Sequence, residues 1–89
     1  MKNIKIRIFG DVQGVNFRRE ASAEAIEIRL KGFVSNQPDD SVYIEAEGKE
    51  EDIERLLKWC YIGPDDAKVI KVEQEISDEI QGYTDFSIR

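Results

Sequence analysis

The residues of this chain best suited to chemistry lie in the stretch Gly10–Arg18, which reads Gly-Asp-Val-Gln-Gly-Val-Asn-Phe-Arg. Glycine tolerates positive φ and has no side chain, so Gly10 and Gly14 allow main-chain N–H groups to point inward together. A helix that begins after the stretch adds free N–H groups and the positive end of its dipole. Arg18 can then bind two oxygens through its planar guanidinium. The stretch predicts a cradle for a phosphate or carboxylate, although an ordinary strand-to-helix turn has the same glycine spacing.

Composition excludes several other classes of function. The chain has 89 residues, with 13 basic and 19 acidic side chains and a formal net charge of −6. Nucleic-acid binding needs clustered Lys and Arg, which are missing here. No apolar run is long enough to cross a membrane, and the alternating N-terminus is unlike a signal peptide, so we expect a cytoplasmic protein. An anion site must therefore depend on local donors.

The chain contains no histidine and a single cysteine, Cys60. Thiol–imidazole catalysis and histidine metal sites are thereby excluded, and Cys60 is expected in the core. A cysteine-based phosphatase needs thiol and arginine on one short loop, yet no arginine follows Cys60 before Arg89. The pairs Asp39-Asp40 and Asp65-Asp66 are typical of solvated turns rather than of a cation site. We expect neither a metal nor a cofactor.

Apolar periodicity predicts the elements that must position the stretch. Ile4, Ile6 and Ile8 alternate with polar or less buried positions, which indicates a strand with one apolar face. Strands are expected over residues 4–9, 32–36, 41–47, 69–72 and 83–88, and helices over 17–29 and 50–62. The order is β-α-β-β-α-β plus a short C-terminal strand. This order predicts an α+β, ferredoxin-like two-layer sandwich, one domain over residues 1–89, with both helices on one face of an antiparallel-rich sheet.

In this topology Asn36 should reach the level of Arg18. If the first strand runs upward, the first helix descends and the second strand returns parallel to the first. A helix of about twelve residues descends roughly 18 Å, and five strand residues plus the connection recover about the same height. Asparagine is also a common turn former, which alone explains its place before a hairpin. Beside an arginine loop, however, its amide would face a bound anion.

Two blocks of the sequence resemble the acylphosphatase family. Gly10–Arg18 is similar to its Gly-x-Val-Gln-Gly-Val-x-Phe-Arg signature, and Gly32–Val42 to its Gly-aromatic-Val-x-Asn block. The resemblance implies that Arg18 and Asn36 are the catalytic residues. It also implies that the main chain of the loop binds the phosphoryl oxygens, through Gln13, Gly14, Val15, Asn16 and Phe17.

The resemblance implies hydrolysis of small acyl phosphates to carboxylate and inorganic phosphate, without metal, cofactor or covalent intermediate. A carboxylate leaves readily without a general acid, and phosphoryl transfer is catalysed mainly by positioning and charge stabilisation. Arg18 would hold the phosphoryl group and Asn36 would orient the attacking water. A monomer is expected. The alternative is a non-catalytic ferredoxin-like module that binds an anion or a protein partner with the same loop.

Three residues depart from the family pattern. Asp11 occupies a position that is often basic, and its carboxylate would weaken anion binding if it faced inward. Asp40 stands at a glycine of the hairpin, and Arg29 stands at a glycine that would end the first helix. Aspartate tolerates a left-handed conformation moderately well, whereas arginine does so less readily.

Overall fold

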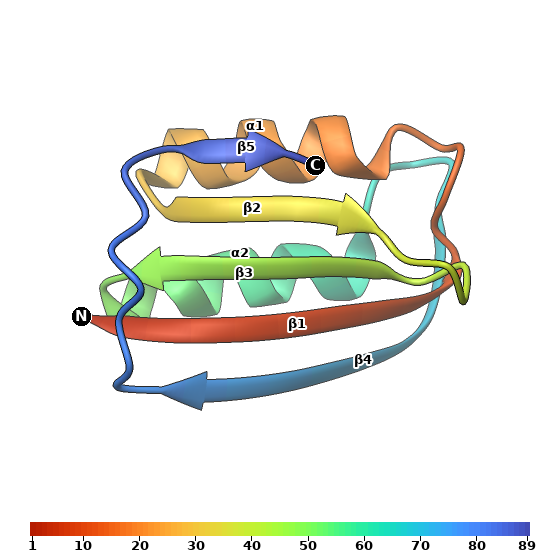
Figure 1. Cartoon of the computed structure of the whole chain (residues 1–89). Coiled ribbons are helices and arrows are strands. Elements are labelled where there is room, and N and C mark those ends of the chain that lie inside the picture. The colour runs from red at the N-terminus through yellow and green to blue at the C-terminus, as the bar shows by residue number, and fades with distance from the viewer.

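The computed structural model describes residues 1–89 and contains a five-stranded sheet with two helices (Figure 1). The strands are Lys2–Asp11 (β1), Lys31–Asn36 (β2), Val42–Gly48 (β3), Lys68–Ser77 (β4) and Phe86–Ile88 (β5), and the helices are Phe17–Ile28 (α1) and Glu50–Ile62 (α2). Neither helix is both long enough and apolar enough to cross a membrane.

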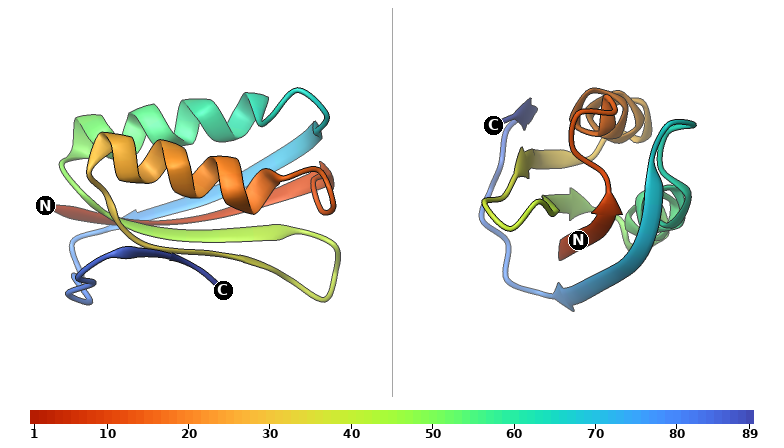
Figure 2. Two further views of the ribbon diagram at one scale, coloured as in Figure 1. Left: turned by 90° about the horizontal axis from the view of Figure 1, so that it is seen from above. Right: turned by 90° about the vertical axis from the view of Figure 1, so that its right-hand side faces the viewer.

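The strand order across the sheet is β4-β1-β3-β2-β5. Strand β1 pairs antiparallel with β3 and β4, β2 pairs antiparallel with β3, and only β5 pairs in parallel, with β2. Both helices lie on the same face of the sheet (Figure 2). The α+β, ferredoxin-like fold predicted from the element order is therefore confirmed.

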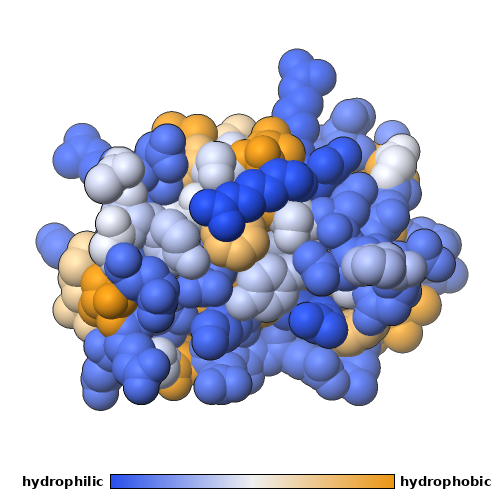
Figure 3. Space-filling model, in the orientation of Figure 1, coloured by the Kyte–Doolittle hydropathy of each residue, from blue (hydrophilic) through white to orange (hydrophobic).

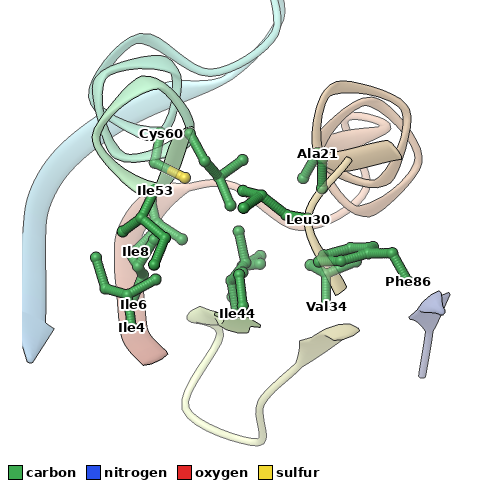
Figure 4. Close-up of a cluster of buried hydrophobic side chains, with 14 of the residues drawn as sticks. Ile4, Ile6, Ile8, Ala21, Leu30, Val34, Ile44, Ile53, Cys60 and Phe86 are labelled. Atoms are coloured by element: carbon green, nitrogen blue, oxygen red, sulfur yellow. The ribbon is translucent and has the colours of Figure 1, made fainter. Parts of the chain in front are cut away.

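The core fills the space between the helices and the sheet (Figure 4). Alternate β1 residues, Ile4, Ile6 and Ile8, point at the helices and are fully buried, because successive strand side chains face opposite sides. Small residues on α1, Ala21 and Ala25, allow that helix to lie close to the sheet. The opposite face of the sheet is largely hydrophilic (Figure 3).

Element boundaries differ from the prediction mainly in β1, β4 and β5. Strand β1 spans Lys2–Asp11, longer than the predicted 4–9. Strand β4 extends over Lys68–Ser77, longer than the predicted 69–72, because it pairs with nearly all of β1. Its second half, residues 73–77, is mostly polar and exposed, so apolar alternation does not predict it. Strand β5 covers only Phe86–Ile88, shorter than the predicted 83–88, and α1 ends at Ile28.

Strand and helix directions bring two loops to one end of the molecule. The loop after β1 and the hairpin between β2 and β3 lie at the right-hand end in Figure 1, and β5 runs towards that end. The connection between β4 and β5, residues 78–85, crosses the opposite end. The first of these ends holds the candidate site.

Candidate active site

The loop between β1 and α1 is shaped by its backbone conformations. A register shift follows Phe9 in the pairing of β1 with β4, and Gly10 has a φ of 133° there. A Cβ on Gly10 would lie 2.1 Å from the Lys68 carbonyl oxygen, so no other residue fits. Gly14 and Asn16 also have positive φ, of 76° and 63°. Such turns aim neighbouring N–H groups towards one point.

These N–H groups have no partner in the protein. The main chain of Gly14, Val15 and Asn16 donates no hydrogen bond to any protein atom. The first hydrogen bond along α1 is donated by the N–H of Glu20 to the Asn16 carbonyl, so the N–H groups of residues 17–19 are also free. A row of free donors at a helix N-terminus favours an anion, as the sequence predicted for this loop.

A cavity of about 290 Å³ opens in front of this loop. Arg18 and Asn36 both line it, although 17 residues lie between them along the chain. None of the eight lining residues is acidic, and two are arginines. The cavity is lined by Val12, Gly14, Asn16, Phe17, Arg18, Arg19, Asn36 and Ile88.

The two polar side chains differ in how they are held. The Arg18 guanidinium donates a hydrogen bond from Nη1 to the main-chain oxygen of Arg89, at 3.2 Å. The end of β5 thereby helps to orient Arg18, and Ile88 closes one side of the cavity. The Asn36 amide is partly buried and makes no hydrogen bond with the protein. Its donor and acceptor therefore remain free for a molecule in the cavity.

The base of the cavity is fixed by aromatic packing. Phe17 begins α1 and is 2% exposed, and its ring meets Trp59 of α2 edge to face at a centroid distance of 5.2 Å. Gly63 lies so close that an added Cβ would be 2.9 Å from the Phe17 ring. The first turn of α1 is thus held against α2, and with it the adjacent Arg18.

The five predicted loop residues occupy three different environments. Gly14, Asn16 and Phe17 line the cavity. Val15 packs against the core instead. Gln13 directs its side chain away from the cavity and towards the hairpin, where Nε2 donates to two main-chain oxygens.

Sequence reasoning missed Arg19 and Ile88, which also line the cavity. Arg19 directly follows Arg18 in the first turn of α1, and this adjacency was the only feature of the sequence that could have placed it at the cavity. Its side chain is exposed and forms no ion pair with the protein. Ile88 reaches the cavity only through the parallel pairing of β5 with β2, which no local pattern reveals.

Asp11, which departs from the family pattern, and the single cysteine, Cys60, both lie outside the cavity. Asp11 is exposed and lines a separate hollow with Asp40, not the cavity of Arg18. Cys60 is fully buried, and burial raises the pKa of its thiol well above the ordinary value. No cluster of three or more His, Cys, Asp or Glu side chains is arranged to hold a metal ion.

Comparison with known proteins identifies the family. The family model described as Acylphosphatase matches residues 4–88. The chain belongs to the acylphosphatase family. It is 43% identical to the acylphosphatases of Shewanella amazonensis and Thermotoga maritima, over 99% and 100% of this chain and 97% and 98% of theirs.

Solved acylphosphatase structures have the same fold. The crystal structure of acylphosphatase from Bacillus subtilis superimposes with a TM-score of 0.97 at 34% identity, covering 100% of this chain and 99% of the other. The activity of the family is hydrolysis of acyl phosphates, which yields inorganic phosphate. The resemblance read from the two sequence blocks is therefore confirmed, as is membership of an enzyme family.

Proposed function

We propose that this acylphosphatase hydrolyses small acyl phosphates by direct attack of a water molecule, with Arg18 holding the phosphoryl group and Asn36 orienting the water. The observation that carries this proposal is the shared cavity, which places a guanidinium and an unpaired amide beside the free N–H groups of the loop. We further propose that the enzyme acts as a cytoplasmic monomer without cofactor, metal or nucleic acid.

The proposed chemistry needs only positioning and charge. Main-chain N–H groups from Gln13 to Phe17 and the Arg18 guanidinium bind the phosphoryl oxygens, where negative charge is spread in the transition state. Asn36 faces the same cavity from β2 and holds a water in line with the bond to the leaving carboxylate. The carboxylate leaves without protonation, so no general acid is required, and the water's proton passes to a phosphoryl oxygen.

Two substitutions test the assigned roles with benzoyl phosphate as substrate. Asn36→Ala should lower kcat on the order of a hundred-fold while KM changes little, because the amide acts on the water and not on the phosphoryl group. Arg18→Ala should lower kcat and weaken binding of inorganic phosphate, because it removes both bidentate donors. Kinetics in the presence of a chelator and phosphate titrations measure the two effects.

Arg55→Ala is the matched control, because Arg55 is an exposed α2 residue outside the cavity. Its kinetics should equal those of the wild type. A wild type that binds phosphate but releases none from benzoyl phosphate would instead support the non-catalytic binding module. Equal losses of phosphate affinity in both site variants would contradict the separate role of Asn36.

A further inference from the structure

The Gln13 side chain joins the two halves of the candidate site. Its amide nitrogen donates one hydrogen bond to the main-chain oxygen of Gln37 and one to that of Ser41, both at 2.9 Å. Because both partners are carbonyl oxygens, only the nitrogen end of the amide can face them. Both hydrogens of one NH₂ group are therefore used, from the β1–α1 loop to the β2–β3 hairpin.

The hairpin that receives these bonds begins directly after Asn36. The N–H of Gln37 donates to the Ser41 oxygen at 2.9 Å, and the N–H of Asp40 donates to the Gln37 oxygen at 3.1 Å. The two oxygens bound by Gln13 are thus the same two that close the hairpin. A change in the Gln13 contact must shift the hairpin as a unit, and its first residue is bonded covalently to Asn36.

No other side-chain hydrogen bond connects the loop with the hairpin. Asn36 itself makes none, and the side chain of Gln37 bonds only to Ser35 within the same strand and turn, at 2.9 Å. The position of the Asn36 amide relative to the loop therefore depends on strand pairing and on the two bonds from Gln13. Val42 of β3 pairs with both Ile8 of β1 and Asn36 of β2, which sets the spacing of the strands. Beyond the strand ends, the two bonds from Gln13 hold the hairpin to the loop.

We propose that Gln13 is a positioning residue, whose side chain sets the distance between the phosphate-binding loop and the water-orienting Asn36. This proposal rests on the proposed function. Gln13 acts through Asn36 and touches neither the phosphoryl group nor the water with its side chain. Loss of the two bonds leaves the cradle and Arg18 in place but lets the hairpin move, and misplacement by about 1 Å can cost a hundred-fold in rate.

A double-mutant cycle with Gln13→Ala and Asn36→Ala tests this proposal. On benzoyl phosphate, Gln13→Ala should lower kcat by about ten- to a hundred-fold in the wild-type background. In the Asn36→Ala background the same substitution should change kcat little, because the group that it positions is already missing. Affinity for inorganic phosphate should change far less than kcat. Gln13→Glu, which turns carboxylate oxygens towards two carbonyl oxygens, should lower kcat at least as much.

Gln74→Ala is the matched control, since it removes an exposed glutamine amide of β4 that lies outside both the loop and the hairpin. It should keep the wild-type kcat. Gln13→Met keeps the side-chain length without a donor and replaces Gln13→Ala if circular dichroism shows that the alanine variant is unfolded. Additive losses in the cycle, or a phosphate affinity that falls as far as kcat, would overturn the positioning role alone. A wild type without turnover would overturn the proposed function itself.

Discussion

Two residues without the freedom of glycine, Arg29 and Asp40, hold left-handed conformations, with φ of 71° and 72°. Arg29 ends α1, and its N–H donates to the Ile26 carbonyl at 3.0 Å. A side chain with a Cβ is disfavoured in this region, by roughly 1–2 kcal/mol for most residues and less for aspartate. Part of the available stability is therefore lost at one helix end and one turn.

Arg29→Gly should raise the free energy of unfolding by about 0.5–1 kcal/mol, since the relieved strain exceeds the added chain entropy of glycine. Asp40→Gly should have a smaller effect, because aspartate tolerates the conformation. Urea unfolding at neutral pH measures both. Glu27→Gly is the control, since Glu27 is an exposed residue inside α1, where glycine should cost about 1 kcal/mol. A destabilised Arg29→Gly variant would show that the Arg29 side chain contributes more than its backbone strain removes.

The sequence allowed Arg18 and Asn36 to be placed at one end of the fold, because strand and helix lengths determine height. The left-handed positions at Arg29 and Asp40 were also foreseeable, since both replace expected glycines. The separate hollow that contains Asp11 and the direction of the Gln13 side chain were not. Both depend on rotamers and on contacts with distant segments, which residue types and spacing do not determine.

At the level of elements, Glu47 of β3 holds the β4–β5 connection by hydrogen bonds on the face of the sheet opposite the helices. Its side chain is 2% exposed and accepts hydrogen bonds from the N–H groups of Gln81, Gly82 and Tyr83 and from the Asn3 amide. Burial opposes ionisation, but these hydrogen bonds outweigh it, so the pKa of Glu47 lies below its ordinary value of 4.5. The connection leads into β5, which carries the Arg18 contact.

A depressed pKa in the folded state means that Glu47 contributes its stability above pH 4.5 and loses it as the pH falls through the lower folded-state value. Glu47→Gln should therefore destabilise the protein by about 1–3 kcal/mol at pH 7, because one amide cannot satisfy all four donors. Between pH 6 and 3 its stability should fall less steeply than that of the wild type. Urea unfolding across this range measures both slopes, with exposed Glu79→Gln as the control. Parallel curves for wild type and Glu47→Gln would contradict this role.

The same connection explains why the C-terminal strand was overestimated from the sequence. Apolar alternation over residues 83–88 predicts a strand, but the N–H of Tyr83 bonds to the Glu47 carboxylate and not to a neighbouring strand. Conversely, β4 is longer than predicted, because pairing with β1 extends it through polar residues at a sheet edge. Strands β2 and β3 and both helices match their local pattern to within one residue, whereas the ends of β1, β4 and β5 are decided by partners far along the chain.

For the molecule as a whole, the net charge of −6 repels an anion, whereas the local charge of the site attracts one. The cavity contains two arginines and no carboxylate among its lining residues, and Asp11 and Asp40 border a different hollow. The acidic surplus therefore lies outside the site, where it favours solubility. Binding of an anion must come from short-range donors, which exist only when α1, β2 and β5 are assembled. Phosphate should accordingly bind only the folded state of the chain and not the unfolded state.

Cys60 reports on that assembly, because it is fully buried between α2 and the sheet (Figure 4). We expect a thiol reagent to label it only through unfolding, since burial raises the thiol pKa and excludes the reagent. Inorganic phosphate at about ten times its Kd should slow labelling by about ten-fold, because it binds only the folded state. Arg18→Ala should abolish this protection, which a chromogenic disulfide measures directly. Rapid labelling that is insensitive to phosphate in the wild type would show that the end of α2 opens locally, without release of the site.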